Sequence, residues 1–366
     1  MYEQSEPPSA LRDLGFCEFF SQGLDEHIGA PGRIVRDGRD LWHVVCEHGK
    51  FVAALSGKFR QSAKARIQQP TVGDWVLVET KGADDRALIH RLLPRRTVIA
   101  RKVPGENMET QAVAANVDTI FIVNALDGGR NFNLRRIERY LALARESGAA
   151  ASLVLNKSDL CGNPQHYADE LHNLAPQIPV YITCAITGLG VDALRATLAP
   201  GQTFVMIGPS GVGKSALVNQ LLGDEIKETG EVRARDKRGR HTTTYRELLR
   251  LPDGALIIDT PGLREIQLWG REENLAETFP DVEQLATECR FADCRHEQEP
   301  GCAVRAAVER GHLTARRLDN YLQLRAELEG LIERQLRHRQ RVERRHRRIL
   351  QHDVDKQDAP RKDKWE

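Results

Sequence analysis

Residues 208–215 have the types and spacing of a loop that binds phosphate groups. Their sequence, GPSGVGKS, follows an apolar run at 204–207 and precedes a helix-like run at 216–222. The glycines let backbone N–H groups turn toward phosphate, and the start of a helix adds a favourable dipole. Lys214 is expected to reach the β- and γ-phosphates, and the Ser215 hydroxyl to bind Mg²⁺. The residues predicted to contact phosphate are Gly208, Ser210, Gly211, Val212, Gly213, Lys214, Ser215 and Ala216.

The tetrapeptide NKSD at 156–159 indicates a guanine nucleotide rather than an adenine nucleotide. A carboxylate at Asp159 can accept hydrogen bonds from guanine N1–H and the 2-amino group, and adenine lacks both donors. Lys157 is expected to lie along the base, and Asn156 to tie neighbouring loops together. An isolated tetrapeptide of this kind is also compatible with a helix-capping turn, but its occurrence beside a phosphate loop favours the guanine interpretation.

Cys184 and Ala185 follow the apolar run 180–182 and resemble the short element whose backbone contacts the guanine oxygen in GTPases. Serine is usual at the first of these positions, so Cys184 is a departure. Both residues are predicted to contact the nucleotide.

The segment DTPG at 259–262 follows another apolar strand and predicts a Mg²⁺ site beside the γ-phosphate. Asp259 is expected to hold the ion through water, and the Gly262 N–H to sense the γ-phosphate. Three threonines at 242–244 lie where a switch loop is expected, and Thr243 is chosen as the Mg²⁺ ligand. An exposed loop at a sheet edge is the alternative interpretation of these threonines.

Hydrolysis needs a group that orients the attacking water, and Ras-like enzymes carry a glutamine directly after DxxG. Leu263 occupies that position here and has no polar group. We therefore expect slow intrinsic hydrolysis, with His241 of the predicted switch loop as the candidate catalytic residue in this chain. A solvent-exposed loop histidine is an equally acceptable interpretation of His241.

The order of these motifs is permuted. The base-specificity motif and the Cys184 element precede the phosphate loop here, whereas they come last in a Ras-like GTPase. A parallel α/β sheet tolerates such a permutation, because the old ends can be joined and a surface loop opened. As a result, the chain that leaves DTPG leads directly into the C-terminal region.

Four residues near the C-terminus have the spacing of a metal site, C-x4-C-x-H-x5-C. Three thiolates and one imidazole are the ligand set of a closed, tetrahedral, structural Zn²⁺ site. Buried or redox-active thiols are the competing interpretation. The predicted ligands are Cys289, Cys294, His296 and Cys302.

Hydrophobic periodicity divides the chain into four regions. Residues 1–32 carry few periodic signals and are predicted to be a peripheral N-terminal extension. Short β segments predict an OB-type β-barrel at 33–100. Strand–helix alternation predicts an α/β circularly permuted P-loop GTPase domain at 101–275, with a linker at 101–110. A helical zinc-binding domain with a basic helix is predicted for 276–366.

Charge is balanced over the 366 residues, with a formal net charge of +1, but the arginines are unevenly distributed. Residues 334–348 hold eight arginines and two histidines against one acid, a density suited to phosphate groups of nucleic acid. A solvated helix surface is the alternative. No apolar run is long enough for a membrane span, and clustered cysteines in an odd number fit a reducing cytoplasm. Nothing indicates an oligomer, so a monomer is the default.

Together, the motifs and their order resemble those of the RsgA (YjeQ/YloQ) family over about residues 33–330. The resemblance implies a GTPase stimulated by the 30S ribosomal subunit that acts late in small-subunit assembly. It also implies contacts of the barrel and the zinc domain with 16S rRNA, and His241 corresponds to the family's catalytic histidine. A GTP-gated RNA-binding or scaffold protein with incidental turnover is the alternative function.

Overall fold

The protein is represented by a computed structural model that divides into two units. The first comprises residues 1–102 and 110–268, and the second comprises 103–109 and 269–366. The residues that the structure describes are 9–25, 27–38, 40–63, 65–80, 85–102, 110–128, 132–223, 246–259 and 273–326, with Glu329 and Glu333.

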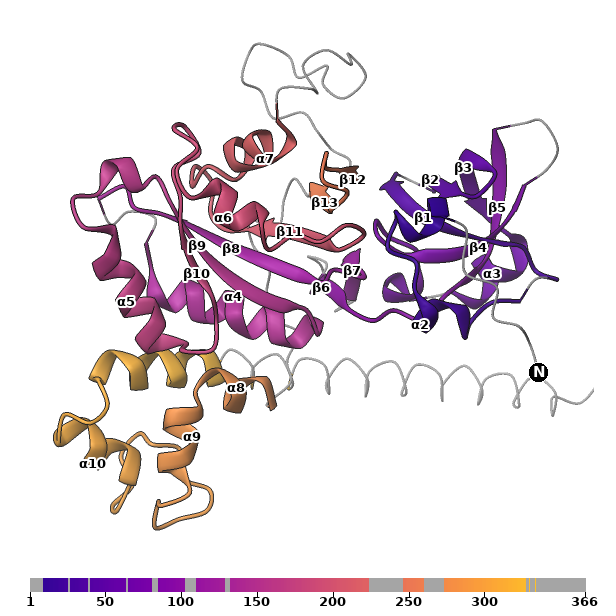
Figure 1. Ribbon diagram of the computed structural model, residues 1–366. Helices are drawn as coiled ribbons and strands as arrows, with labels where there is room; N and C mark the ends of the chain where they lie inside the picture. Colours follow the sequence, from indigo (N-terminus) through magenta and orange to yellow (C-terminus); the bar gives the residue numbers. More distant parts are fainter. Residues whose placement is uncertain are drawn as a thin grey trace, which may run out of the picture. The chain divides into compact units, whose positions relative to one another are not determined.

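Five strands at the start of the first unit close into a barrel (Figure 1). Their order is β1-β2-β3-β5-β4, and a further pairing of β1 with β4 completes the ring; β3 and β5 run parallel and the other pairs antiparallel. The predicted OB-type barrel is therefore confirmed. The strands are β1 (Ala30–Asp37), β2 (Trp42–Cys46), β3 (Gly49–Leu55), β4 (Trp75–Thr80) and β5 (Arg86–Leu92), with helix α3 (Gly57–Ser62) and a 3-10 turn (Arg66–Gln68) between β3 and β4.

Alternating side chains fill the barrel. Every second residue of a strand points inward, so Ile34, Val44 and Ile89 meet in a buried cluster with other apolar residues. The barrel therefore has an apolar core of its own, as the alternation in the sequence requires.

The α/β part of the first unit is a sheet with strand order β10-β9-β8-β11-β13-β12, in which only β12 is antiparallel to its neighbour. Helices α4 and α5 cover one face and α6 and α7 the other (Figure 1). The predicted α/β architecture is confirmed. The strands are β8 (Thr119–Ala125), β9 (Ala150–Asn156), β10 (Val180–Ile182), β11 (Thr203–Ile207), β12 (Glu247–Arg250) and β13 (Leu256–Asp259). The helices are α4 (Leu134–Ser147), α5 (Pro164–Leu174), α6 (Val191–Arg195) and α7 (Lys214–Leu222).

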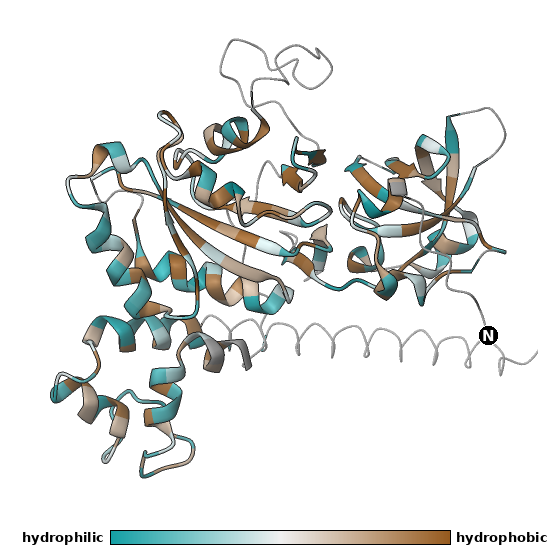
Figure 2. Cartoon of the chain, in the orientation of Figure 1, coloured by the Kyte–Doolittle hydropathy of each residue, from teal (hydrophilic) through white to brown (hydrophobic). Residues whose placement is uncertain are grey.

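The central strands are apolar because both faces of the sheet are covered. Figure 2 shows the hydrophobic colour along these strands and hydrophilic residues on the outer helices. Phe121, Phe204 and Ile257 pack with Leu217 and Leu221 of α7 in one cluster, and the rings of Phe121 and Phe204 meet edge to face. Continuous apolar runs are what a parallel sheet buried on both faces requires.

The described residues 9–20 of the predicted extension pack against the barrel and are not peripheral, contrary to the prediction. Helices α1 (Ser9–Arg12) and α2 (Glu18–Ser21) place Leu11, Phe16 and Phe20 in a buried cluster around Trp75 of β4. The rings of Phe16 and Trp75 have centroids 4.8 Å apart in an edge-to-face arrangement. Moreover, β1 begins at Ala30, before the predicted start of the barrel at residue 33.

A buried arginine joins the barrel to the α/β sheet. The Arg33 guanidinium donates to the Thr203 hydroxyl (2.8 Å), to the carbonyl oxygens of Gly73 and Asn116 (3.3 Å each), and to the carbonyl of Leu14. Burial lowers the pKa of Arg33 to about 10, although nearby carboxylates oppose this shift. The side chain therefore stays charged at neutral pH and holds together segments from the extension, the barrel and the sheet.

The chain passes from the barrel to the sheet through a hairpin. Strands β6 (Val98–Lys102) and β7 (Thr110–Ala115) pair antiparallel, so both ends of the predicted linker 101–110 are strands. Its centre, 103–109, lies outside the described residues.

The described part of the second unit is helical, as predicted, and Phe279, Val282, Val304 and Tyr321 are buried in it. Its elements are α8 (Glu273–Thr278), α9 (Pro280–Ala286), α10 (Ala303–Glu309) and a helical segment at 315–326. Among the residues described in the two units, no helix combines the length and the apolar character needed to cross a membrane.

Candidate nucleotide and metal sites

The predicted phosphate loop connects β11 to α7 as its sequence requires. Gly208 and Gly213 have φ angles of 147° and 95°, in the region that favours glycine. A Cβ at Gly208 would lie 2.2 Å from the carbonyl oxygen of Val123, and one at Gly213 would lie 2.3 Å from Asn156 Nδ2. Lys214 Nζ donates to the carbonyl oxygens of Gly208 and Pro209, at 2.8 Å each. The loop therefore folds closely around neighbouring backbone.

Three motifs meet at Asn156. Its amide Nδ2 donates to the Val212 carbonyl of the phosphate loop at 2.8 Å. Its Oδ1 accepts from the Ala185 N–H at 3.1 Å and from the Thr183 hydroxyl at 3.3 Å. Asn156 is 1% exposed, so these bonds have little competition from water. One buried amide therefore fixes the base loop, the Cys184 element and the phosphate loop relative to one another.

Asp159 and Lys157 lie next to this amide and are each held by a neighbour. The Cys184 thiol donates to Asp159 Oδ1 at 3.1 Å, with Cys184 buried and Asp159 exposed. Lys157 has a left-handed backbone (φ 61°), and its Nζ lies 3.6 Å from Asp127 Oδ2. The carboxylate and the ammonium are thus placed at the mouth of the loops that Asn156 joins.

Asp127 was not identified from the sequence. It follows β8, whose end lies at the same edge of the sheet as the ends of β9 and β11, because these strands are parallel. Asp127 could have been predicted as a site residue because it is an acidic residue two positions after a buried parallel strand.

Asp259 ends β13, which runs parallel to β11 and pairs with it from Thr203↔Leu256 to Val205↔Ile258. This register places Asp259 beside the strand end from which the phosphate loop begins. The other predicted residues of this region, Thr243, His241, Gly262 and Leu263, lie outside the described residues, as does the basic stretch 334–348.

The four predicted metal ligands are brought together in the second unit. Their candidate donor atoms all lie within 4.8 Å of one another. Cys289 Sγ is 3.9 Å from Cys302 Sγ, and His296 Nδ1 is 3.6 Å from Cys289 Sγ and 3.4 Å from Cys302 Sγ. Tetrahedral Zn²⁺ with ordinary bond lengths sets S···S at about 3.8 Å and S···N at about 3.6 Å. The residues therefore fit a tetrahedral metal ion that binds through three sulfurs and Nδ1.

Surrounding groups favour the metal-binding form of His296 but not that of the Cys294 thiol. His296 is 4% exposed, and burial together with the positive charge of Arg325 lowers its pKa, which favours the neutral imidazole that a metal needs. Burial, and then the neighbouring Cys302 and Cys289, raise the pKa of Cys294 to about 11. A bound metal ion would counteract this rise in pKa, because a thiol that coordinates a metal ion loses its proton. Cys302 is the N-cap of α10, where its sulfur accepts from the Arg305 N–H at 3.5 Å.

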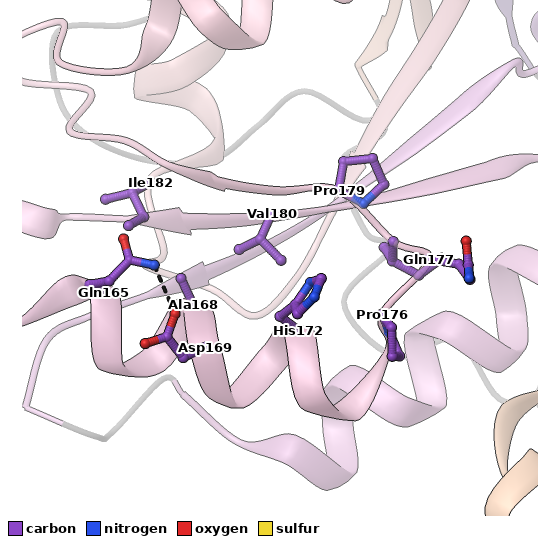
Figure 3. Close-up of a pocket in the computed structure, with 10 residues that line it drawn as sticks. Gln165, Ala168, Asp169, His172, Pro176, Gln177, Pro179, Val180 and Ile182 are labelled. Atoms are coloured by element: carbon purple, nitrogen blue, oxygen red, sulfur yellow. Dashed lines mark hydrogen bonds between the residues drawn. The ribbon is translucent and has the colours of Figure 1, made fainter.

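A hollow of about 500 Å³ lies elsewhere, between α5 and β10 (Figure 3). Its walls include Gln165, Asp169 and His172 of α5, and the Gln165 amide donates to the Asp169 carboxylate at 2.8 Å. Among the described residues, no member of the predicted nucleotide motifs lines it. The candidate nucleotide site is therefore the edge of the sheet where β9, β10, β11 and β13 end.

Known proteins share both this sequence and this architecture. The family model described as RsgA GTPase matches residues 92–269. A protein of Opitutus terrae, named small ribosomal subunit biogenesis GTPase RsgA, is 44% identical over 329 residues, which are 87% of this chain and 89% of that protein. The crystal structure of YjeQ from Thermotoga maritima has a TM-score of 0.61 and 28% identity, covering 82% of this chain and 99% of that one. YloQ, described as a circularly permuted GTPase, has a TM-score of 0.57 and 25% identity, covering 82% of this chain and 95% of that one.

Proposed function

Because the chain belongs to the RsgA family of GTPases, we propose that it hydrolyses GTP to GDP and phosphate as a switch on the small ribosomal subunit. The observation that carries this proposal is the set of hydrogen bonds of Asn156, which fixes a guanine-reading loop against a phosphate loop. Other nucleotide-binding folds use a phosphate loop, but the loop with Asp159 supplies the selection of guanine.

Each predicted residue has a role in this proposal. Asp159 accepts from the guanine ring, Lys157 lies along it, and Cys184 and Ala185 complete the base pocket. Residues 208–216 surround the phosphates, with Lys214 neutralising their charge. Ser215, Thr243 and, through water, Asp259 would hold Mg²⁺, which when bound would supply charge stabilisation at the phosphate oxygens.

Hydrolysis is assigned to a residue other than the one after DTPG, because Leu263 cannot orient water. His241 is the proposed catalytic residue, and Gly262 the sensor of the γ-phosphate. Since a single histidine replaces a preorganised glutamine, we propose that the ribosomal subunit raises a slow intrinsic rate.

The remaining assignments concern partners, metal and domains. The barrel, the metal-binding domain and the basic stretch 334–348 are proposed to contact 16S rRNA of the 30S subunit, late in its assembly. Zn²⁺ is the proposed structural ion, because three thiolates and an imidazole select it over harder cations. We propose a cytoplasmic monomer; the cytoplasmic location is in line with seven cysteines that form no disulfide bond. The proposed domains are an N-terminal extension and a barrel within 1–100, with the barrel beginning at Ala30, followed by 101–275 and 276–366.

The test is the rate of GTP hydrolysis with and without isolated 30S subunits, together with co-sedimentation in GDP and in a non-hydrolysable GTP analogue. Stimulation by the subunit, with binding that depends on the nucleotide, supports the switch. Nucleotide-dependent binding without stimulation favours a GTP-gated scaffold. Sedimentation with another particle points to a different target.

A further inference from the structure

Strand β1 takes part in both the barrel and the α/β sheet. Its first half pairs with β4 inside the barrel, from Ala30↔Val78 to Arg33↔Trp75. Its second half pairs with β12 at the edge of the α/β sheet, with Arg36 opposite Glu247. The register of β1 with β2 shifts between Ile34 and Arg36, and such a bulge bends a strand. The barrel and the α/β sheet therefore form one continuous 11-stranded sheet.

An ion pair fastens this joint. Arg246 Nη1 lies 2.8 Å from Asp37 Oδ2, and the Arg246 N–H donates to Asp37 Oδ1 at 3.3 Å. In return, the Asp37 N–H donates to the Arg246 carbonyl at 3.3 Å. Both side chains are only 16% exposed, so water screens the pair less than it screens a surface pair. Three contacts thus fix the residue that enters β12 to the residue that ends β1.

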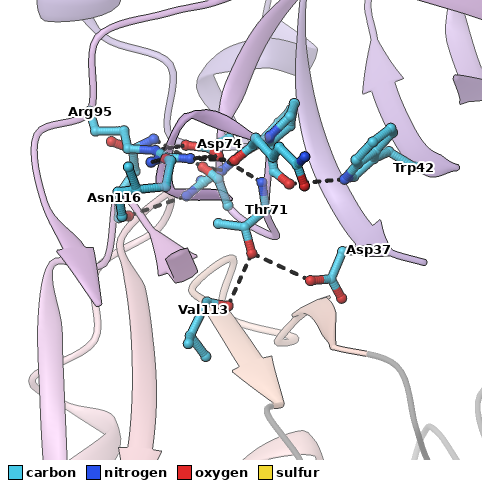
Figure 4. Close-up of polar contacts among 12 residues, drawn as sticks. Asp37, Trp42, Thr71, Asp74, Arg95, Val113 and Asn116 are labelled. Carbon is cyan, nitrogen blue, oxygen red and sulfur yellow. Dashed lines mark hydrogen bonds and ion pairs between the residues drawn. The ribbon is translucent and has the colours of Figure 1, made fainter. Parts of the chain in front are cut away.

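Among the described residues, Thr71 and Arg101 also lie in the environment of the pair. The Thr71 hydroxyl lies 3.4 Å from Asp37 Oδ2 and 3.2 Å from the Val113 carbonyl, between the two (Figure 4). Arg101 of β6 is close enough for the charge of Arg246 to lower its pKa, after the larger effect of burial. Without the Asp37 carboxylate, the Arg246 guanidinium would therefore lose its paired negative charge and keep the like charge of Arg101 nearby.

The pairing register extends this joint to the nucleotide site. Arg36 of β1 is opposite Glu247 of β12, and Glu247 is opposite Asp259 of β13. One row of residues thus crosses three strands from the barrel to Asp259. The Asp37–Arg246 pair lies one position away from this row, so a change in the placement of β12 reaches Asp259 through a single strand pairing.

We propose that Asp37 and Arg246 are positioning residues through which the barrel sets the placement of Asp259. This inference rests on the proposed function, in which Asp259 belongs to the Mg²⁺–GTP site. A displacement of the barrel then changes the geometry of the Mg²⁺ site, whereas the guanine-reading loops, which lie on the far side of β11, are unaffected.

The test compares Asp37→Asn and Arg246→Met with the wild type in two assays. Mg²⁺ slows the release of fluorescent mant-GDP, and the first assay measures the Mg²⁺ concentration that produces half of this slowing. The second assay measures GTP hydrolysis with and without 30S subunits. We expect each variant to need about fivefold more Mg²⁺, while affinity for mant-GDP in EDTA is unchanged. The charge-swapped double variant, Asp37→Arg with Arg246→Asp, should recover part of the loss.

The matched control is Arg250, which ends β12, the strand that Arg246 precedes. Arg250 Nη2 pairs with Asp13 Oδ2 at 3.0 Å, but both side chains are about half exposed and Arg250 is opposite Leu256, away from Asp259. Arg250→Met should leave the Mg²⁺ requirement unchanged. An unchanged requirement in both Asp37→Asn and Arg246→Met, or a lower melting temperature without a Mg²⁺ shift, overturns the proposal. If 30S subunits fail to stimulate the wild type, the proposed function fails, but the Mg²⁺ shift still decides the role of Asp37 and Arg246.

Discussion

The Cys184 thiol donates a hydrogen bond to the Asp159 carboxylate, with 3.1 Å between Sγ and Oδ1. A thiol is a weaker donor than the serine hydroxyl usual at this position. The thiol therefore orients the Asp159 carboxylate, and the carboxylate keeps most of its capacity to accept hydrogen bonds from guanine. Cys184 is 1% exposed and Asp159 is exposed, so the thiol end of this bond is buried and the carboxylate end is open to solvent. The orientation of the residue proposed to read guanine thus depends on one buried thiol.

Replacing Cys184 tests this dependence. Cys184→Val keeps a small apolar side chain, with one more heavy atom, but removes the donor, so we expect GDP affinity to fall about fivefold, the value of one modest hydrogen bond. Cys184→Ser restores a donor and should bind GDP within about twofold of the wild type. Equilibrium binding of mant-GDP measures both, with the melting temperature as a check on folding. Wild-type affinity in Cys184→Val would remove the thiol from the account of nucleotide binding.

Asp159→Asn should change the base that is bound. The amide offers an N–H₂ group where the carboxylate offered only acceptors, which suits the 2-oxo group of xanthine and not the 2-amino group of guanine. We expect GTP affinity to fall by at least about a hundredfold and XTP to be bound in its place. Competition of GTP and XTP against a labelled nucleotide decides this, and a variant that still prefers GTP would contradict the assigned base contact.

The motifs of the candidate site could be predicted from the sequence because each is a local pattern directly after a strand. The strands of the barrel and the central strands of the sheet were predicted for the same reason, since their side chains alternate or form continuous apolar runs. Strand β12 was missed, because its four residues, ELLR, have no pattern of their own and follow a polar stretch. Its place is specified by its neighbours β13 and β1.

Long-range contacts are the part that the sequence did not reveal. Asp37 and Arg246 are 209 residues apart, and nothing local to either residue indicates the other. The N-terminal segment was misjudged for a related reason. Leu11, Phe16 and Phe20 are too few for a clear period, and their burial depends on Trp75, which is far along the chain.

Removal of the metal should destabilise the second unit selectively. Cys302→Ser replaces a thiolate ligand and loosens the cap of α10, so we expect bound zinc to fall from about one per chain to near zero. Chelation of the wild type should lower the melting transition of this unit in the same way. Metal analysis and calorimetry measure the two effects. Cys161→Ser is the control, because Cys161 lies outside the cluster, and zinc loss in this variant would contradict the assigned ligands.

Tyr321 should give the second unit a dependence on alkaline pH. Its hydroxyl donates to Glu283 Oε1 at 3.0 Å, and burial followed by the Glu283 charge raises its pKa to about 12. The folded state then binds the phenolic proton more tightly than the unfolded state, whose pKa is about 10. This stabilisation is complete below about pH 10 and is lost as pH rises toward 12. Tyrosinate absorbance should show a group that titrates near pH 12 and is missing in Tyr321→Phe; identical curves would exclude the shift.

Arg33 should be irreplaceable by an apolar side chain, unlike many buried ion pairs. Where both partners of a buried pair are side chains, apolar replacement of both is often harmless. The acceptors here are three backbone carbonyls and the Thr203 hydroxyl, which no side-chain substitution at position 33 removes. We expect Arg33→Met to remove the donor to the Leu14 and Asn116 carbonyls and the Thr203 hydroxyl, while the Gly73 carbonyl keeps the Asn116 amide, and to lower the free energy of unfolding of the first unit by about 3–5 kcal/mol. Arg33→Lys should cost less, since an ammonium satisfies some of these acceptors but lacks the planar fork. Denaturation followed by tryptophan fluorescence measures the loss, with Arg91→Met as the control because Arg91 of β5 is exposed. A methionine variant as stable as this control would show that the junction is held by apolar packing around Trp75 and not by the guanidinium.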